Sequence, residues 1–201
     1  GRKGWYGAYR DSTIFKTAFA WGLRIGELRM LDVADFGVNP HSPEFGSHGV
    51  LHVRYGKAMK GSPPKRRSVL TVFDWSVETL QAWQRIRSQY LDRKSGPLWP
   101  SERSDRVAAS RIQEQFRLVR DECDLPDSLT FHSFRRSYVT LLIESGFDPR
   151  FVQEQVGHQH ASTTSLYTAV SSDFRVNSLR RSLDALGDQI ISHYPEGKDH
   201  R

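Results

Sequence analysis

The sequence is poor in cysteine, with Cys123 as the one thiol in 201 residues. No disulfide can therefore form within the chain, which fits a reducing compartment. Cys123 stands among three acidic residues, Asp121, Glu122 and Asp124. Because acidic neighbours disfavour the thiolate that acts as a nucleophile, we do not expect a catalytic cysteine.

Long hydrophobic runs and phosphate-binding loops are also missing. No apolar stretch approaches the length that spans a bilayer, about 20 residues, and the first residues do not resemble a signal peptide. No Gly-x-x-x-x-Gly-Lys motif is present, so ATP hydrolysis is unsupported. The chain starts at Gly1 rather than at methionine, and we expect it to be an excised piece of a longer protein.

Basic residues outnumber acidic ones. Lys and Arg total 29 against 23 for Asp and Glu, which gives a net charge of +6 and a pI near 9.6. Such an excess favours a polyanionic partner, most commonly nucleic acid. A basic surface that is merely solvated is the alternative, because net charge bears on partners and solubility rather than on fold.

Hydrophobic periodicity predicts a mainly helical chain. Asp11 or Ser12 is expected to cap a first helix that ends at Gly22. The other helices are expected over residues 25–31, after Asp74, over 108–119, from a cap at Thr130, from a cap at Asp148 to Gly157, around Tyr167, and over 179–190.

Two segments, residues 50–55 and 67–73, predict the strands of one small antiparallel sheet. Residues 37–49 are expected to form a loop. The predicted fold class is therefore mainly α with a small antiparallel β-sheet (α+β). We expect a single catalytic domain over 1–201, with its core over about 10–186 and a partly disordered tail over 187–201.

Three short clusters hold residues that can do chemistry. They are Gly22-Leu23-Arg24-Ile25-Gly26-Glu27-Leu28, His132-Ser133-Phe134-Arg135, and Gly157-His158 with Tyr167 nine residues later. Each cluster has a simpler interpretation when it is taken alone. Arg24 and Glu27 can pair across one helical turn, the two histidines can satisfy helix ends, and Tyr167 can be a core aromatic residue.

Taken together, the ordered set resembles the tyrosine recombinases, the phage integrase family. Arg-Ile-Gly-Glu-Leu, a Gly-Lys in a strand turn, His-x-x-Arg, Gly-His and Tyr follow one another in the order and spacing of that family. Residues 98–101, 130–140 and 163–167 also resemble family segments. The resemblance covers about residues 10–186. It implies six catalytic residues: Arg24, Lys57, His132, Arg135, His158 and Tyr167.

The implied roles suit phosphodiester chemistry. The non-bridging oxygens of a phosphodiester gain negative charge in the transition state, and fixed donors aimed at them lower the barrier. The planar guanidinium groups of Arg24 and Arg135 match those oxygens, with His158 as a third donor. Glu27 is implied as a supporting residue.

In this resemblance Tyr167 is the nucleophile. A phosphotyrosyl ester conserves the energy of the broken bond, so that a strand can be rejoined without ATP. A phenol is mostly protonated at neutral pH and needs activation, and His132 is expected to take its proton. Lys57 is implied as the acid that protonates the departing 5′-oxygen. A phosphate-contacting or solvated lysine is the alternative for Lys57.

Metal-assisted cleavage is the rival chemistry. Two-metal sites need clustered carboxylates, and the sequence shows no such cluster. His158 and His160 form a possible pair, but no third ligand follows at a metal spacing. We therefore expect no metal and no other cofactor.

The sequence departs from the common family pattern in the basic residues outside the catalytic set. Arg136 stands where many relatives have histidine, and we expect it to contact DNA or an acidic neighbour. The turn over residues 57–66 is longer than in compact relatives. Its basic residues Lys60, Lys65 and Arg66 are expected to bind DNA.

The two ends of the chain raise further expectations. Only about 23 residues precede Arg24, so we expect the N-terminal DNA-binding domain of the family to be absent and DNA binding by this chain to be weak. Near the other end, one helix face carries an apolar stripe made of Leu179, Leu183, Leu186 and Ile190. This stripe can cover the chain's own core or, as in the family, dock on a neighbouring protomer.

The sequence thus predicts a site-specific DNA recombinase or integrase that forms a 3′-phosphotyrosyl link without metal or ATP. Its expected partner is double-stranded DNA, with a homotetramer formed on DNA by the full-length protein and a monomer formed by this piece. A type IB topoisomerase-like enzyme and a non-catalytic DNA-binding module are the alternatives. We expect a cytoplasmic, nucleoid-associated location of bacterial or phage type and no membrane partner.

Overall fold

The computed structural model describes residues 4–56, 63–91, 94–101 and 105–157. They form a mainly helical fold with one small antiparallel sheet, as the sequence predicts. The helices are α1 (Trp5–Ala20), α2 (Ile25–Arg29), α3 (Asp74–Leu91), α4 (Ala109–Glu122), α5 (Ser133–Glu144) and α6 (Pro149–Val156), with the 3-10 turns η1 (Val33–Asp35) and η2 (Pro43–His48). The strands are β1 (Phe36–Gly37), β2 (Val50–Val53) and β3 (Arg67–Leu70).

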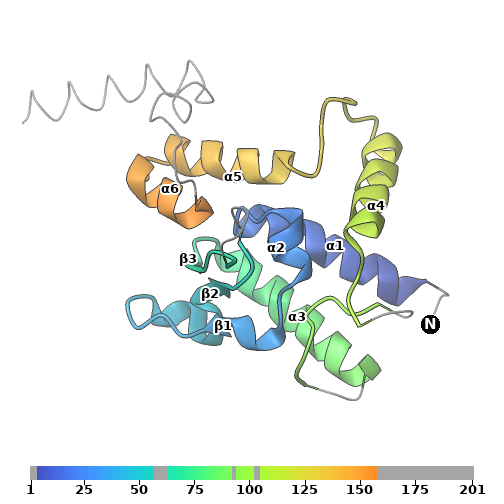
Figure 1. Ribbon diagram of the computed structural model, residues 1–201, viewed down its shortest axis with the longest axis horizontal. Helices are drawn as coiled ribbons and strands as arrows, with labels where there is room; N and C mark the ends of the chain where they lie inside the picture. The colour runs from blue at the N-terminus through green and yellow to red at the C-terminus, as the bar shows by residue number, and fades with distance from the viewer. Residues whose placement is uncertain (1–3, 57–62, 92–93, 102–104, 158–201) are drawn as a thin grey trace, which may run out of the picture.

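Helix α1 runs through the middle of the molecule, between α3 and α5 (Figure 1). Helix α4 stands at an angle to it and contacts both α1 and α2. Helix α6 contacts α5 on one side and β3 on the other, and so links the helices to the sheet. Consequently α2, α5, α6 and β3 lie around a common region, to which the sequence assigns the functional residues.

The sheet has the strand order β1-β2-β3, with both pairs antiparallel. Leu51 pairs with Val69 and Val53 pairs with Arg67 on the face that points into the core. The sequence prediction of a loop over residues 37–49 was therefore incomplete, because Gly37 lies in β1 and residues 43–48 form η2. A two-residue strand carries too little alternation of apolar and polar residues to be recognised.

The core is built around tryptophans. Trp21, Trp83 and Trp99 are fully buried, and the rings of Trp83 and Trp99 stack with their centroids 5.9 Å apart. The indole N–H of Trp21 donates to the Thr71 hydroxyl at 3.2 Å, so this large apolar ring also satisfies its polar atom. A smaller apolar cluster joins α5 to α6.

Two predicted helix starts are wrong. Helix α1 begins at Trp5, and Asp11 lies inside it, where its carboxylate pairs with the buried guanidinium of Arg10 at 2.8 Å. Helix α5 begins at Ser133 with His132 as its N-cap. Thr130 does not cap this helix; instead its backbone N–H donates to the hydroxyl of Ser133.

Three predicted helix termini are confirmed, one at a start and two at an end. Gly22 follows α1 with φ +58°, and a Cβ atom there would lie 2.5 Å from Cδ1 of Tyr138. Asp148 caps α6 by accepting hydrogen bonds from the backbone N–H groups of Arg150 and Phe151. Gly157 closes α6 in the left-handed conformation, with φ +63°.

Candidate active site

Arg24 lies at the N-cap of α2, in the short connection that follows α1. Its Nη1 donates to Oε1 of Glu27 at 2.8 Å, and its backbone N–H donates to Oε2 of the same carboxylate at 3.0 Å. Pairing between Arg24 and Glu27, which the sequence suggests as the simple alternative, is therefore present. Within the described residues the Nε and Nη2 groups of Arg24 have no partner, so the side chain retains donors for a further ligand.

Glu27 also binds a second arginine, Arg67 of β3. The Nη1 and Nη2 atoms of Arg67 donate to Oε1 and Oε2 of Glu27 at 2.8 and 2.9 Å. Burial of Glu27 opposes its ionisation, but the hydrogen bonds and charge of Arg67, together with hydrogen bonds from Arg24, outweigh it and lower the pKa of Glu27. Glu27 is therefore a charged carboxylate, and it joins α2 to the sheet.

Arg135 projects from α5 into the same region and is 1% exposed. Its Nη1 donates to the carbonyl oxygen of Gly22 at 2.8 Å, and its Nη2 donates to the carbonyl oxygen of Val156. Its Nε is buried and has no partner among the described residues. Burial, and then the positive charge of Arg24, lowers the pKa of Arg135 to about 9. A guanidinium in this setting is stabilised by an anion.

His132, which precedes α5, is exposed. Desolvation and the positive charges of Arg135, Arg136 and Arg24 lower the pKa of His132 below 6.5. The imidazole is therefore neutral at pH 7, which is the form that accepts a proton.

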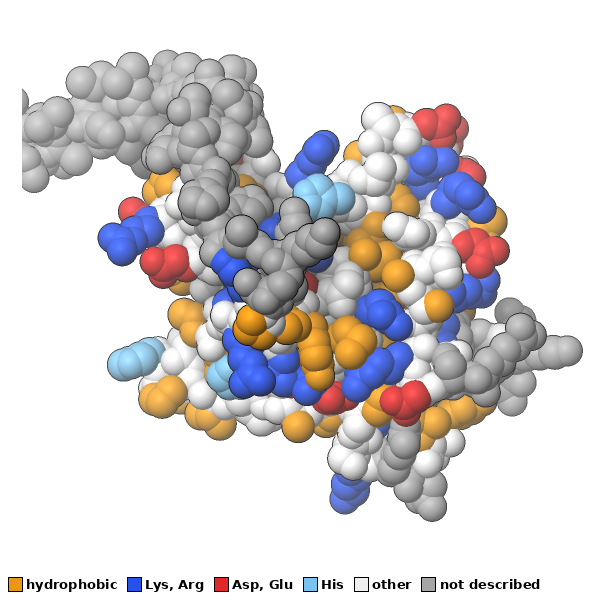
Figure 2. Space-filling view, viewed as in Figure 1, with side chains coloured by type: hydrophobic (Ala, Val, Ile, Leu, Met, Phe, Trp, Pro, Cys, Tyr) orange, Lys and Arg blue, Asp and Glu red, His pale blue; other side chains and the backbone are white. Residues whose placement is uncertain are grey.

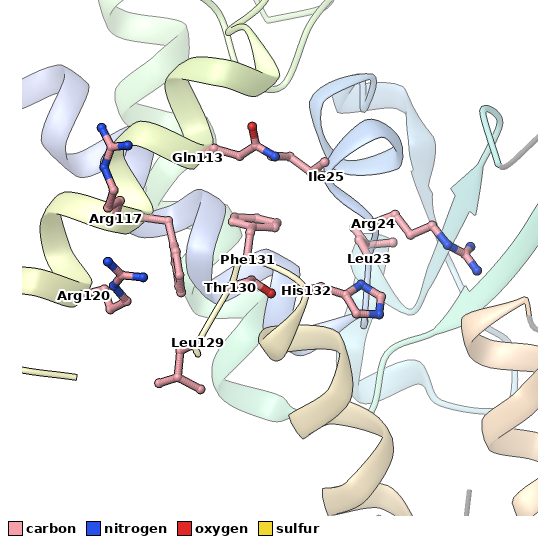
Figure 3. A pocket seen from close by; sticks show the side chains of 11 residues that line it. Leu23, Arg24, Ile25, Gln113, Arg117, Arg120, Leu129, Thr130, Phe131 and His132 are labelled. Atoms are coloured by element: carbon pink, nitrogen blue, oxygen red, sulfur yellow. The ribbon is translucent and has the colours of Figure 1, made fainter. Parts of the chain in front are cut away.

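A pocket of about 420 Å³ opens beside Arg24 and His132. In Figure 3 the side chains of Arg24 and His132 lie at one end of the pocket, and Arg117 and Arg120 of α4 lie at the other end. Phe131 lies between the two ends. Basic side chains also gather near the middle of the face shown in Figure 2. The described part of the site thus has the charge that an anionic ligand requires.

The basic residues that the sequence assigns to DNA binding are only partly described. Lys65 is half-buried, and its carbonyl oxygen accepts a hydrogen bond from the Gly56 N–H at 2.9 Å, which closes the base of the β2–β3 turn. Arg66 is exposed and lines a groove of about 400 Å³ beside Arg54 and Arg67. Arg136 is exposed on α5.

The predictions for Lys57, Lys60, His158 and Tyr167 lie outside the described residues, as does the apolar stripe of residues 179–190. The structure therefore brings together Arg24, Glu27, His132 and Arg135 of the predicted site. It also describes Gly56 and Gly157, which directly precede Lys57 and His158 in the sequence.

The sequence reasoning missed Arg67, which was placed only within a predicted strand. A signal for it exists, because Arg67 and Val69 are two residues apart in β3 and so share a face of the sheet, and Val69 is fully buried. An arginine on a buried face needs an acidic or carbonyl partner.

In the described ranges, no three His, Cys, Asp or Glu side chains are grouped so that they could hold a metal ion. No helix in this part of the chain is both long enough and apolar enough to cross a membrane.

Comparison with known proteins supplies the family. A model of the phage integrase family matches residues 6–173. Tyrosine recombinase XerD of Staphylococcus saprophyticus is 30% identical over 165 residues, which are 81% of this chain and 51% of that protein. Tyrosine recombinase XerC of Shewanella sp. (strain ANA-3) is 29% identical over 161 residues, 80% of this chain and 48% of that protein. The chain thus spans about half the length of these relatives.

Solved structures show the same fold. The XerA recombinase has a TM-score of 0.63 and 22% identity, with 96% of this chain and 59% of that chain covered. The XerH site-specific recombinase bound to its difH substrate, in a pre-cleavage complex, has a TM-score of 0.63 and 20% identity, with 90% of this chain and 49% of that chain covered. Arg24, Glu27, His132 and Arg135 therefore lie on a scaffold that recombinases share.

Proposed function

The chain belongs to the phage integrase family, and we propose that it is the catalytic domain of a tyrosine recombinase that cleaves and rejoins double-stranded DNA at a specific site. In this proposal Tyr167 attacks the phosphorus atom and forms a 3′-phosphotyrosyl link, and the 5′-hydroxyl leaves. Attack by that hydroxyl on the phosphotyrosyl ester then reseals a strand and frees Tyr167. The bond energy is conserved, so the cycle needs no ATP, and the cationic donors stabilise the phosphate charge in place of a metal ion.

The observation that carries the proposal is that Arg135 lies close to the Arg24–Glu27 pair, because it binds the carbonyl oxygen of Gly22, two residues before Arg24. The charges of Arg24 and Glu27 both act on Arg135, although Arg135 comes from a helix more than 100 residues later in the chain. Arg24 has donors without a partner among the described residues, and so has Arg135 at its buried Nε. Such donors, held before substrate arrives, match the charge that develops on the phosphate oxygens.

The other roles follow from the chemistry of the site. His132, kept neutral by desolvation and by its cationic neighbours, accepts the proton of Tyr167. Lys57 protonates the leaving 5′-oxygen, and His158 donates to a phosphate oxygen. Lys60, Lys65, Arg66 and Arg136 contact the DNA backbone, which sets affinity and register rather than sequence.

The chain matches about half the length of the relatives named as recombinases, and the XerH neighbour was solved with its DNA substrate. We propose that this chain likewise acts on DNA within a longer protein, as a tetramer on the paired sites. The segment after Tyr167 either covers its own domain or docks on a neighbouring protomer.

A nicked duplex tests the proposal, because loss of a short fragment after cleavage traps the covalent product. Since the target sequence is unidentified, the probe is a pool of nicked duplexes with randomised sequence around the nick. We expect a protein–DNA adduct that survives denaturation and forms equally well in a metal chelator. A wild-type chain that binds this pool but forms no adduct would refute the proposal.

A further inference from the structure

We propose that Arg67 is a positioning residue for cleavage, which orients Arg24 through Glu27 and fixes the end of α6 through Gln155. The inference rests on the proposed function, because it assigns a part to Arg67 in that same reaction. Arg67 does not belong to the six residues to which we assign contact with the reacting groups.

Arg67 contacts Glu27 from β3. The side chain of Glu27 is 2% exposed, that of Arg67 is 13% exposed, and that of Arg24 is 29% exposed. Glu27 is thus the most buried of the three, and Arg67, the less exposed of the two arginines, occupies both of its carboxylate oxygens. A planar guanidinium that binds both oxygens fixes the orientation of the carboxylate, and the carboxylate in turn fixes the backbone and side chain of Arg24.

Charge gives Arg67 a second effect on Arg24. The cluster holds three guanidinium groups, of Arg24, Arg67 and Arg135, against the single carboxylate of Glu27, so its net charge is +2. Without Arg67 the carboxylate would neutralise Arg24 alone. Because Arg67 shares that carboxylate, the electrostatic potential around Arg24 stays positive, which favours the binding of a phosphate.

Arg67 also contacts the end of α6. Nε of Arg67 donates to the carbonyl oxygen of Gln155 at 3.0 Å, and the Gln155 side chain accepts from the backbone N–H of Leu70 at 2.9 Å. Gln155 is 3% exposed. Gly157 packs directly on Arg67, since a Cβ atom at Gly157 would lie 2.9 Å from Cδ of Arg67. Arg67 therefore fixes the last turn of α6, after which the sequence continues to His158.

A positioning role differs from two simpler roles in which property a substitution of Arg67 would change. A purely structural arginine would affect stability alone, as Arg54 should: it directly follows β2 and pairs with Asp32 and Asp35 rather than with Glu27. An arginine that contacts DNA would affect affinity. A positioning residue affects the cleavage rate at saturating DNA, because misplacement of a donor by a fraction of an ångström weakens transition-state binding more than substrate binding.

The test compares Arg67→Ala, Arg67→Lys and the control Arg54→Ala on the duplex that wild type selects from the randomised nicked pool. Single-turnover adduct formation at saturating DNA gives the rate, titration gives the Kd, and NMR of the side-chain carboxyl carbon gives the pKa of Glu27. We expect Arg67→Ala to slow cleavage by on the order of 10- to 100-fold with little change in Kd, and to raise the pKa of Glu27. Arg67→Lys should recover part of the rate, because one ammonium group supplies the charge but cannot bind both carboxylate oxygens and Gln155.

Three results would overturn the inference. The first is an Arg67→Ala variant that matches Arg54→Ala in both rate and Glu27 pKa, which leaves only a structural role. The second is weaker binding with an unchanged rate at saturating DNA, which makes Arg67 a DNA contact. If wild type itself forms no adduct, the proposed function fails and takes the inference with it, whereas a wild-type adduct with an unaffected Arg67→Ala variant refutes the inference alone.

Discussion

Arg135 of α5 donates a hydrogen bond through Nη2 to the carbonyl oxygen of Val156, the last residue of α6. Its Nη1 binds the carbonyl oxygen of Gly22, two residues before Arg24. One buried side chain therefore holds both the turn that carries Arg24 and the helix end that precedes His158. Among the proposed phosphate-binding groups, Arg24 and Arg135 are thus positioned by the folded scaffold before DNA binds.

Replacing Arg135 with lysine should separate this structural contribution from the chemical one. Lysine keeps a positive charge but loses the fork that spans two carbonyl groups, so we expect cleavage at saturating DNA to fall by roughly 100- to 1,000-fold. The matched control is Arg87→Lys. Arg87 is also 1% exposed and also binds two carbonyl groups, of Pro97 and Ser95, outside the site. Equal rate losses in the two variants would show that Arg135 acts only through stability.

The acid side of the pH–rate profile should report His132. Because its pKa is lowered, His132 stays neutral down to a pH below 6.5 and accepts a proton throughout that range. As the pH falls through its pKa, the imidazole becomes protonated and the cleavage rate should drop. His132→Gln should be slower and should lose this limb. An unchanged acid limb in His132→Gln, measured by single-turnover cleavage, would assign the limb to another group.

The carboxylate of Glu27 should make stability depend on pH. Its pKa is lowered from 4.5 in the folded chain, so the unfolded chain binds the proton more tightly. The stability that Glu27 contributes is therefore complete above 4.5 and is lost as the pH falls through the folded pKa. We expect Glu27→Gln to lower the free energy of unfolding by about 2 kcal/mol at neutral pH, with the difference shrinking in acid. Denaturant unfolding at several pH values measures this, and a constant difference would contradict it.

Gly157 should be intolerant of a side chain for two reasons that a control can separate. Its φ is +63°, and a Cβ atom would press on Arg67. Gly146 has φ +85° with open space around it, so Gly146→Ala carries the conformational cost of about 1 kcal/mol without the contact. We expect Gly157→Ala to lose more stability than Gly146→Ala and to slow cleavage as well. If thermal unfolding shows equal losses, the packing of Gly157 on Arg67 contributes nothing.

The parts of the fold that followed from the sequence were those with strong local signals. Asp148-Pro149 and Gly157 give the two ends of α6 because a carboxylate caps free N–H groups and glycine adopts a positive φ. The start of α1 was missed because Asp11 resembles a cap. Only its buried pairing with Arg10, which also reaches the carbonyl of Pro100, explains its place inside the helix.

The site was foreseen as a set of residues but not as a network. Motif order indicated Arg24, Glu27, His132 and Arg135, and these four lie in one region of the structure. Two of the ties that organise them join residues far apart in the chain: Arg67 binds Glu27 across 40 positions, and Arg135 binds Gly22 across 113. Such contacts arise from tertiary packing and leave no local periodicity in the sequence.

Covalent attachment of DNA to Tyr167 is measured by mass spectrometry of the trapped adduct. After nuclease and protease digestion, we expect one peptide that carries a nucleotide on the Tyr167 phenolic oxygen, and no adduct from Tyr167→Phe. A nucleotide on another residue, or an adduct that persists in Tyr167→Phe, would exclude Tyr167 as the nucleophile.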